Sequence, residues 1–252
     1  MAQFVTTMPS PCSFRLPRLL ILVVTCVCLG SSANAQCLGN TKRELRQDGG
    51  WLWHGIVEAP RDAVRPRNLK WELPIAAATG VLIASGDTPA SRLIQSPSLQ
   101  RQANRWSNIG LALEFGGAGT AYVFGCAENR DTVRSIGQAA LEAAAAASVL
   151  DQIAKRATNR QRPSRNASAG EFWEGGSSFA SGHAAASFAI ASVVAHRYSH
   201  NRWLKWGVYG LAAGVSLARY PGKEHFFSDI LVGGTLGYVT GTYLATPHVG
   251  MR

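Results

Sequence analysis

Charged residues are scarce in this chain of 252 residues, where they make up 16%, and acidic residues are the scarcer sign, with 15 Asp and Glu against 25 Lys and Arg. Glycine follows no repeat, and hydrophobic residues make up 46%. A disordered or collagen-like chain is therefore excluded, because there is ample apolar surface to bury. The net charge of +10 leaves nucleic acid, an anionic membrane surface and an anionic substrate as possible partners.

The first 35 residues contain no acidic residue at all. Arg15 and Arg18 precede an apolar run from Leu19 to Leu29, and Ala33-Asn34-Ala35 supplies a small-x-small cleavage site. This pattern predicts a secretory signal peptide over residues 1–35. A first transmembrane helix is the alternative, but it needs about 20 apolar residues. We therefore expect export to the periplasm or cell envelope, either soluble or membrane-associated.

Cysteine is also scarce, and none of the cysteines belongs to a spaced Cys/His set, so a structural zinc site is not expected. Only Cys37 and Cys126 follow the predicted cleavage site. In an oxidising compartment they form either one disulfide or two independent thiols. No zinc finger, helix-turn-helix or aromatic-basic pattern is present, so we do not expect a nucleic-acid partner.

Residues 36–70 are polar, basic and interrupted by Gly and Pro, which predicts an irregular N-terminal extension with at most a short helix. It contains two tryptophans and several cations that either face an anionic headgroup layer or pack on the rest of the protein. These residues are Trp51, Trp53, Arg61, Arg65, Arg67 and Lys70.

From Trp71 onward, apolar segments rich in small residues follow one another without the alternation of β-strands. We predict a single all-α domain over residues 71–247, a bundle of about six helices with the active site at helix ends. The expected helical segments are 74–86, 107–125, 134–154, 182–198, 203–218 and 229–246.

Membrane insertion of these helices stays open on the sequence alone. Alanine favours insertion into a membrane only weakly. Glu114, Glu142 and Lys205 interrupt the segments, and an ionisable side chain near the middle of a span costs about 2.5–3.5 kcal/mol of insertion free energy. This favours a soluble or peripherally attached bundle. Small residues, however, also allow transmembrane helices to approach closely.

The first of three stretches with chemical potential runs from Lys155 to Pro163. Lys155 and Arg162 are two helical turns apart, so they share a face if the helix continues until Pro163 ends it. Two cations at a helix end make a clamp for phosphate or carboxylate. A solvated basic face is the alternative.

The second stretch runs from Ser177 to His183 and opens an apolar helix. Ser181 is a candidate N-cap, and the free backbone N–H groups of Gly182 and His183 would point at an anion beside the positive helix dipole. The alternative for His183 is a buried structural histidine whose ring nitrogens have hydrogen-bond partners.

The third stretch runs from Ala218 to Asp229. His225 and Asp229 are spaced i, i+4, so the carboxylate can accept a hydrogen bond from one ring nitrogen and leave the other as a nucleophile or base. Arg219 adds a third cation. A structural His/Asp pair is the alternative for this stretch taken alone.

In order, the stretches read Lys-x6-Arg-Pro, Ser-Gly-His and Arg-x5-His-x3-Asp. This arrangement resembles the three-part signature of the type-2 phosphatidic acid phosphatase and vanadium haloperoxidase superfamily, over about Trp71 to Thr246. Two positions depart from the signature, Ala180 where the family commonly has Pro and Ala218 where it commonly has Ser. We expect these departures to change loop stiffness or pocket polarity more than activity.

By position, the resemblance implies that His225 attacks phosphorus and forms a phosphohistidine while Asp229 orients its ring. His183 protonates the leaving oxygen and later deprotonates the hydrolytic water. The groups that would hold the phosphoryl oxygens are Lys155, Arg162, Ser181, Gly182 and Arg219. No carboxylate cluster for a metal is apparent, so neither metal nor cofactor is expected.

The leading hypothesis is thus an exported, metal-independent phosphatase of phosphomonoesters, lipid phosphates or lipid pyrophosphates. One alternative is a haloperoxidase that holds vanadate, a phosphate mimic, on His225. Another is a non-catalytic envelope protein that binds anionic lipid. Other residues are expected to be structural or solvated: His54, His196, His200 and His248, the loop residues Glu171, Phe172 and Trp173, and a coincidental sequon at residues 166–168.

Overall fold

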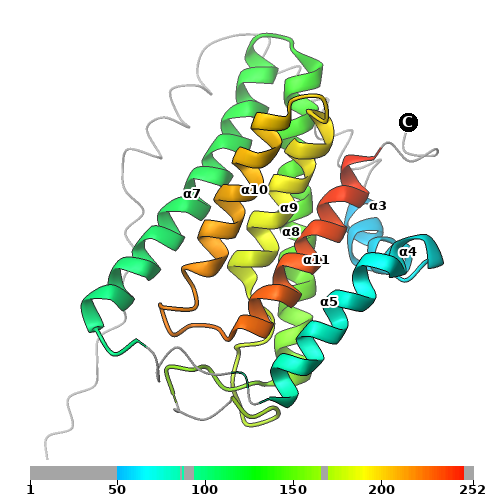
Figure 1. Cartoon of the computed structure of the whole chain (residues 1–252). Helices are drawn as coiled ribbons and strands as arrows, with labels where there is room; N and C mark the ends of the chain where they lie inside the picture. The colour runs from blue at the N-terminus through cyan, green and yellow to red at the C-terminus, as the bar shows by residue number, and fades with distance from the viewer. Residues whose placement is uncertain (1–49, 86, 88–93, 166–169, 247–252) are drawn as a thin grey trace, which may run out of the picture.

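The computed structural model describes residues 50–85, 87, 94–165 and 170–246, and this part of the chain is helical with no strand. The signal peptide, Cys37, the sequon and His248 fall outside it. Six long helices confirm the predicted all-α bundle (Figure 1). They are α5 (Pro66–Ala84), α7 (Pro97–Ala127), α8 (Asp131–Thr158), α9 (Gly182–Arg197), α10 (Arg202–Leu217) and α11 (Phe227–Ala245).

The described part of the predicted extension is helical, so the expectation of an irregular segment is wrong for residues 50–70. Three short elements precede α5: α3 (Gly50–Trp53), the π-helical η1 (His54–Glu58) and α4 (Ala59–Ala63). Gly55 packs so closely on the bundle that an added Cβ would lie 2.6 Å from Ala146 Cβ. Burial against α8 and α11 thus decides the conformation, which a polar, Pro-containing sequence does not predict.

Two of the helices begin well before the predicted apolar segments. α7 begins at Pro97, where Ser96 is the N-cap and its side chain accepts a hydrogen bond from Leu99 N. α5 begins at Pro66. Both prolines stand in the first turn, where their missing N–H leaves no bond unmade. A search for apolar segments misses such polar first turns.

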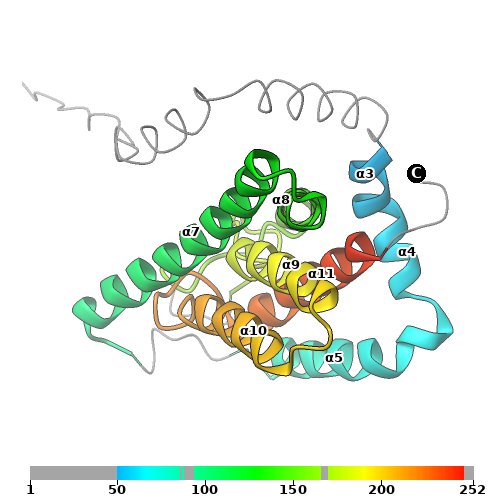
Figure 2. The ribbon, with the colours of Figure 1, turned by 90° about the horizontal axis from the view of Figure 1, so that it is seen from above.

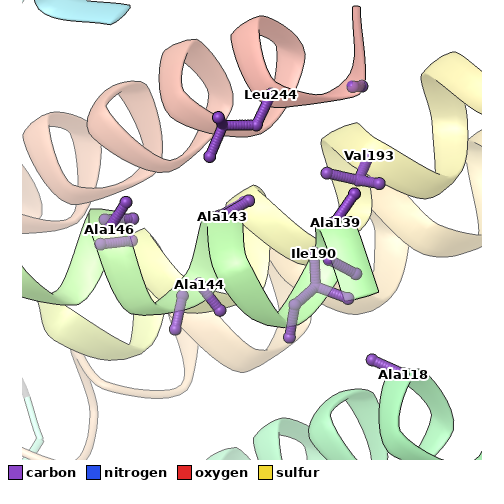
Figure 3. Packing of buried hydrophobic residues seen from close by; sticks show 14 residues of the cluster. Ala118, Ala139, Ala143, Ala144, Ala146, Ile190, Val193 and Leu244 are labelled. Atoms are coloured by element: carbon purple, nitrogen blue, oxygen red, sulfur yellow. The ribbon is translucent and has the colours of Figure 1, made fainter. Parts of the chain in front are cut away.

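Helix α9 lies at the centre of the bundle and contacts α7, α8, α10 and α11 (Figure 2). Ten of its 16 residues are buried, on every side of the helix. The core around it consists mainly of alanine from α8 and α9, with Ile190, Val193 and Leu244 as the larger members (Figure 3). Because alanine is small, the helix backbones approach closely and fill the interior without bulky side chains.

Helices α9 and α11 are in the closest contact, through a glycine face on α11. Added Cβ atoms at Gly233, Gly237 and Gly241 would lie 2.4, 2.1 and 2.4 Å from backbone oxygens of α9 or its N-cap. These glycines recur every fourth residue and so share one helix face. This contact fixes the start of α9 against the start of α11, where the second and third sequence stretches lie.

The outer faces of several helices carry large apolar side chains. The exposed residues include Trp71, Leu73 and Val81 on α5, Trp106, Leu113 and Phe124 on α7, and Trp203, Trp206 and Leu211 on α10. Within the described residues, the helix Pro97–Ala127 has the length and composition to cross a membrane, and 22% of its most apolar window is buried. An apolar helix with so little burial presents most of its surface outward.

Candidate active site

The three sequence stretches meet at one end of the bundle, the lower end in Figure 1, where α8 and α10 end and α9 and α11 begin. The backbone N–H of Ser181 donates to the carbonyl of Asp229 at 3.0 Å and ties the second stretch to the third. All eight predicted site residues lie in this region.

Helix α8 extends beyond the predicted segment 134–154 but stops before Pro163. Its last residue is Thr158, and Asn159 adopts a left-handed conformation with φ 44° and ψ 36°. Asparagine tolerates this conformation better than most residues, which stops the helix before Pro163. Lys155 and Arg162 therefore do not share a helix face, and Arg162 reaches the site from the following loop.

His225 lies just before α11 and is buried. Its Nδ1–H donates to the Ser178 carbonyl at 2.7 Å, whereas Asp229 Oδ2 is 3.7 Å from Nδ1. The predicted role of Asp229 in fixing the tautomer is thus taken by a backbone carbonyl, and Asp229 acts on the ring through its charge. With the proton on Nδ1, Nε2 has a free lone pair. Burial lowers the pKa of His225 and so favours the neutral ring.

Asp229 is fully buried and is held by several donors. Its Oδ2 accepts from Phe226 N at 2.9 Å and from Ser178 Oγ at 2.5 Å, and its Oδ1 accepts from Arg160 Nη1 at 2.7 Å. Burial alone would raise its pKa, but His225, Arg160 and Ser178 outweigh burial and hold the pKa below its usual value. Asp229 is therefore an anion fixed beneath the histidine.

Arg160 is the main functional residue that the sequence did not identify. Its side chain is 1% exposed, and besides Asp229 it bonds Ser228 Oγ at 2.7 Å and Asp87 Oδ2 at 3.2 Å. The guanidinium also lies 4.2 Å from the ring centroid of Phe226. A planar guanidinium suits these simultaneous contacts. Its position two residues before Arg162 was a signal, but only the folded chain shows that Arg160 faces inward.

Lys155 and Gly182 are placed together by a buried acid. Lys155 Nζ lies 2.6 Å from Asp151 Oδ2. Burial raises the pKa of Asp151, and the hydrogen bond from Lys155 opposes that shift. A Cβ on Gly182 would lie 2.9 Å from Asp151 Oδ2 and 3.3 Å from Lys155 Nζ. Glycine at this position therefore brings the backbone at the start of α9 next to the ammonium group.

Arg162 and Arg219 share one carboxylate, that of Glu224. Arg162 Nη1 is 2.5 Å and Arg219 Nη2 is 3.5 Å from Glu224 Oε2. The sequence did not single out Glu224. Its carboxylate lies between the two cations that the resemblance assigns to phosphate, so an arriving phosphate would share or displace it.

Several buried donors at this end of the bundle have no hydrogen-bond partner in the described part of the chain. They are Ser181 Oγ and the Nε atoms of Arg162 and Arg219. Ser181 is the N-cap residue of α9, as predicted, but its side chain makes no capping hydrogen bond. Unsatisfied buried donors are rare in proteins and call for a specific explanation. All three belong to residues that the resemblance assigns to phosphate, whose oxygens would accept their hydrogen bonds.

His183 is held by α7, an element that the sequence stretches do not include. Its Nε2 lies 2.8 Å from Asn108 Oδ1, an acceptor, so Nε2 carries the proton. Arg219 Nη1 also approaches Asn104 Oδ1 and Asn108 Oδ1, at 3.3 and 3.4 Å. Ser107 Oγ donates to the Val215 carbonyl at 2.8 Å and so fixes α7 on α10.

The environment of His183 disfavours its protonated form. Burial, together with the positive charges of Arg219, Lys155 and Arg162, lowers the pKa of His183 to about 3. The same field that disfavours an imidazolium favours an anion. The free protein therefore holds a neutral His183 close to three cations.

The other residues with a possible role lie elsewhere or pack the site. His196 and His200 are exposed at the end of α9, as the solvated reading predicted. Phe172 packs on Phe179 and Arg160, while Trp173 is 76% exposed. No group of three His, Cys, Asp or Glu side chains within the described ranges has a geometry suited to a metal ion. Cys126 is disulfide-bonded.

Comparisons with known proteins find a family match over the segment that contains this site. The model of the PAP2 superfamily matches residues 138–248. None of the curated proteins compared with the chain matches it. Among solved structures, the chain is similar to one described as the first transmembrane PAP2 type phosphatidylglycerolphosphate phosphatase from Bacillus subtilis, with 17% identity, a TM-score of 0.42 and coverage of 77% of this chain and 92% of that chain. The matched segment contains all three sequence stretches, so the resemblance to the PAP2 superfamily is confirmed over residues 138–248.

Proposed function

We propose that this protein is an exported phosphatase that acts on phosphomonoesters or lipid phosphates through a phosphohistidine at His225, without a metal ion. The observation that carries the proposal is the set of buried donors with no partner in the described chain, Ser181 Oγ, Arg162 Nε and Arg219 Nε. A phosphoryl group has three equatorial oxygens, so it could offer one charged hydrogen-bond acceptor to each of these three donors.

In the first step, His225 Nε2 attacks phosphorus, and the bond from phosphorus to the leaving oxygen breaks as the N–P bond forms. The ring keeps its proton on Nδ1, which donates a hydrogen bond to the Ser178 carbonyl. The ring therefore becomes cationic when Nε2 is phosphorylated. The Asp229 carboxylate, 3.7 Å from Nδ1, stabilises that positive charge. Arg160 keeps Asp229 in place and ionised.

His183 supplies and recovers the proton. It is neutral in the free protein, but a phosphoryl dianion between the cations would raise its pKa, so that it takes up a proton from solvent when the substrate binds. The imidazolium then protonates the leaving oxygen. In the second step the neutral ring accepts a proton from water as the water oxygen attacks phosphorus and the N–P bond breaks, which releases phosphate.

Positive side chains and a helix terminus would supply the charge stabilisation that a metal ion gives other phosphatases. Lys155, Arg162 and Arg219 contribute three cations, and the start of α9 contributes the backbone N–H of Gly182 and the positive end of the helix dipole. Phosphoryl transfer depends mainly on positioning and on this kind of stabilisation.

The outer surface favours a substrate at a membrane. α5, α7 and α10 expose tryptophan and aliphatic side chains, and exposed apolar surface of this extent is typical of membrane or protein contacts. Trp203 and Trp206 lie beside Arg202 and Lys205 at the start of α10, a combination found at lipid headgroups. We therefore include lipid phosphates among the substrates and expect the protein to associate with membranes.

The proposal is tested by phosphate release from a soluble aryl phosphomonoester and from a lipid phosphate in vesicles, each with and without a chelator. We expect turnover that the chelator does not reduce and that His225→Ala abolishes. His196→Ala, which changes an exposed histidine outside the site, is the matched control and should keep full activity. Equal activity of the wild-type protein and His225→Ala, or loss of activity with the chelator, would overturn it.

A further inference from the structure

One face of α7 lies beside the proposed active site and carries two arginines that the mechanism does not use. We infer that this face, formed by Arg101, Asn104, Arg105 and Asn108, is the subsite for the leaving group, and that its arginines select leaving groups that carry an anion close to the scissile phosphorus. The inference rests on the proposed phosphatase function and extends it to substrate selection.

These four residues line a shallow, open hollow of about 660 Å³ on α7, with Ile109 and Ala112 beyond them. Spacings of three and four residues put them on one side of the helix. The lining is cationic towards the start of α7 and apolar towards its middle. α7 lies outside residues 138–248, so the subsite is not part of the matched family segment.

The hollow is continuous with the proposed phosphate site through its two asparagines. Asn108 Oδ1 accepts from His183 Nε2 at 2.8 Å, and Asn104 Nδ2 donates to the Gly222 carbonyl at 3.0 Å. His183 is the group proposed to protonate the leaving oxygen, so the leaving group must approach it. Its Nε2 contacts Asn108, which also lines the hollow, so a leaving group beside His183 would extend along this face of α7.

Arg101 and Arg105 are available to a ligand. Both are exposed, and neither pairs with any described acidic residue. In contrast, Lys155 and Arg162 already contact carboxylates. At a rise of 1.5 Å per residue, Arg105 and Arg101 lie about 4.5 and 10 Å along the helix axis from Asn108. Their side chains can therefore reach an anion attached within a few atoms of the scissile phosphorus, such as the inner phosphate of a diphosphate.

The test compares an alkyl diphosphate with the alkyl monophosphate of the same chain. When the terminal phosphorus is attacked, the diphosphate gives an anionic leaving group and the monophosphate a neutral alcohol. We expect the double variant Arg101→Gln/Arg105→Gln to lower kcat/KM for the diphosphate by about tenfold or more, and for the monophosphate by less than about twofold, since charge-assisted hydrogen bonds are lost only with the former.

The matched control is Arg130→Gln/Arg197→Gln, which removes the same charge from two exposed positions at the start of α8 and the end of α9, away from the proposed site. It should leave both substrates unchanged. An equal fall on both substrates, or no fall on the diphosphate, would overturn the inference while phosphatase activity persists. Failure of the wild-type protein to hydrolyse either substrate would instead overturn the proposed function.

Discussion

Arg160 Nη1 and Asp229 Oδ1 lie 2.7 Å apart, in side chains that are 1% and 0% exposed. This ion pair joins the loop after α8 to the start of α11. It holds the carboxylate that faces the proposed nucleophile, His225. A buried pair of this kind is costly to break, because the remaining charge loses its partner in a low-dielectric interior.

Replacement of Arg160 by Met should destabilise the protein and inactivate it. Loss of one partner of a buried pair costs about 3–5 kcal/mol in free energy of unfolding, and both Asp229 and Asp87 lose their cation. Denaturant unfolding measures the loss. Arg156→Met, at an exposed position near the end of α8, is the control and should change stability by less than about 0.5 kcal/mol. A stable, active Arg160→Met variant would contradict this role.

Asn108→Asp should raise the pKa of His183. The substitution places a negative charge about 2.8 Å from Nε2 in place of a neutral acceptor, and a nearby anion favours the imidazolium. NMR titration of the His183 ring should show a pKa above the value of about 3 for the wild-type protein. An unchanged His183 titration would show that Asn108 does not control this proton.

Glu224→Gln should tighten the binding of inorganic phosphate or vanadate. Glu224 now lies between Arg162 and Arg219 and neutralises part of their charge. Its removal leaves both cations to the ligand, and we expect the inhibition constant to fall by about tenfold. Weaker inhibition would mean that Glu224 mainly orients the arginines. The conservative Glu224→Asp should keep an inhibition constant nearer to that of the wild type.

Gly182→Ala should reduce turnover with little effect on folding. The new Cβ would displace the Lys155 and Asp151 side chains, which lie 3.3 and 2.9 Å from its position. Misplacement of a phosphate-binding group should lower kcat roughly tenfold to a hundredfold. Gly207→Ala is the control, because its Cβ would meet nothing within 4 Å on an exposed part of α10. That variant should keep full activity and gain about 0.5–1 kcal/mol of stability.

Stability should fall as the pH drops below about 6.5. The pKa of His183 is about 3 in the folded protein, against about 6.5 in the unfolded chain. Between these values the unfolded chain binds more protons, so acid favours unfolding, with a slope of at most about 1.4 kcal/mol per pH unit for this group. Denaturant unfolding between pH 4 and 7 should show a smaller slope for His183→Gln than for the wild-type protein. Equal slopes would contradict the lowered pKa.

The helical class and the site residues follow from local sequence features. Long segments rich in alanine without strand alternation predict helices, and the spacing of Lys155, His183 and His225 within their motifs predicts the family resemblance that the comparison confirms over residues 138–248. Motif residues are recognisable because the chemistry fixes their type and local spacing. Export, the absence of a metal and the phosphohistidine remain predictions, and the chelator and His225→Ala experiments test the last two.

Tertiary contacts decided the features that local patterns do not carry. Asn159 ended α8 early, Gly55 packed a polar extension onto the bundle as helix, and the Ser178 carbonyl took the tautomer-fixing role expected of Asp229. Arg160 and Asn108 joined the site from positions with no motif. The sequence alone determined the helical class and predicted which groups perform the chemistry, since charge and proton transfer dictate their types. Only the folded structure determined which residues position these groups. Any polar side chain that packing brings within hydrogen-bond reach can position them, so no sequence motif marks it.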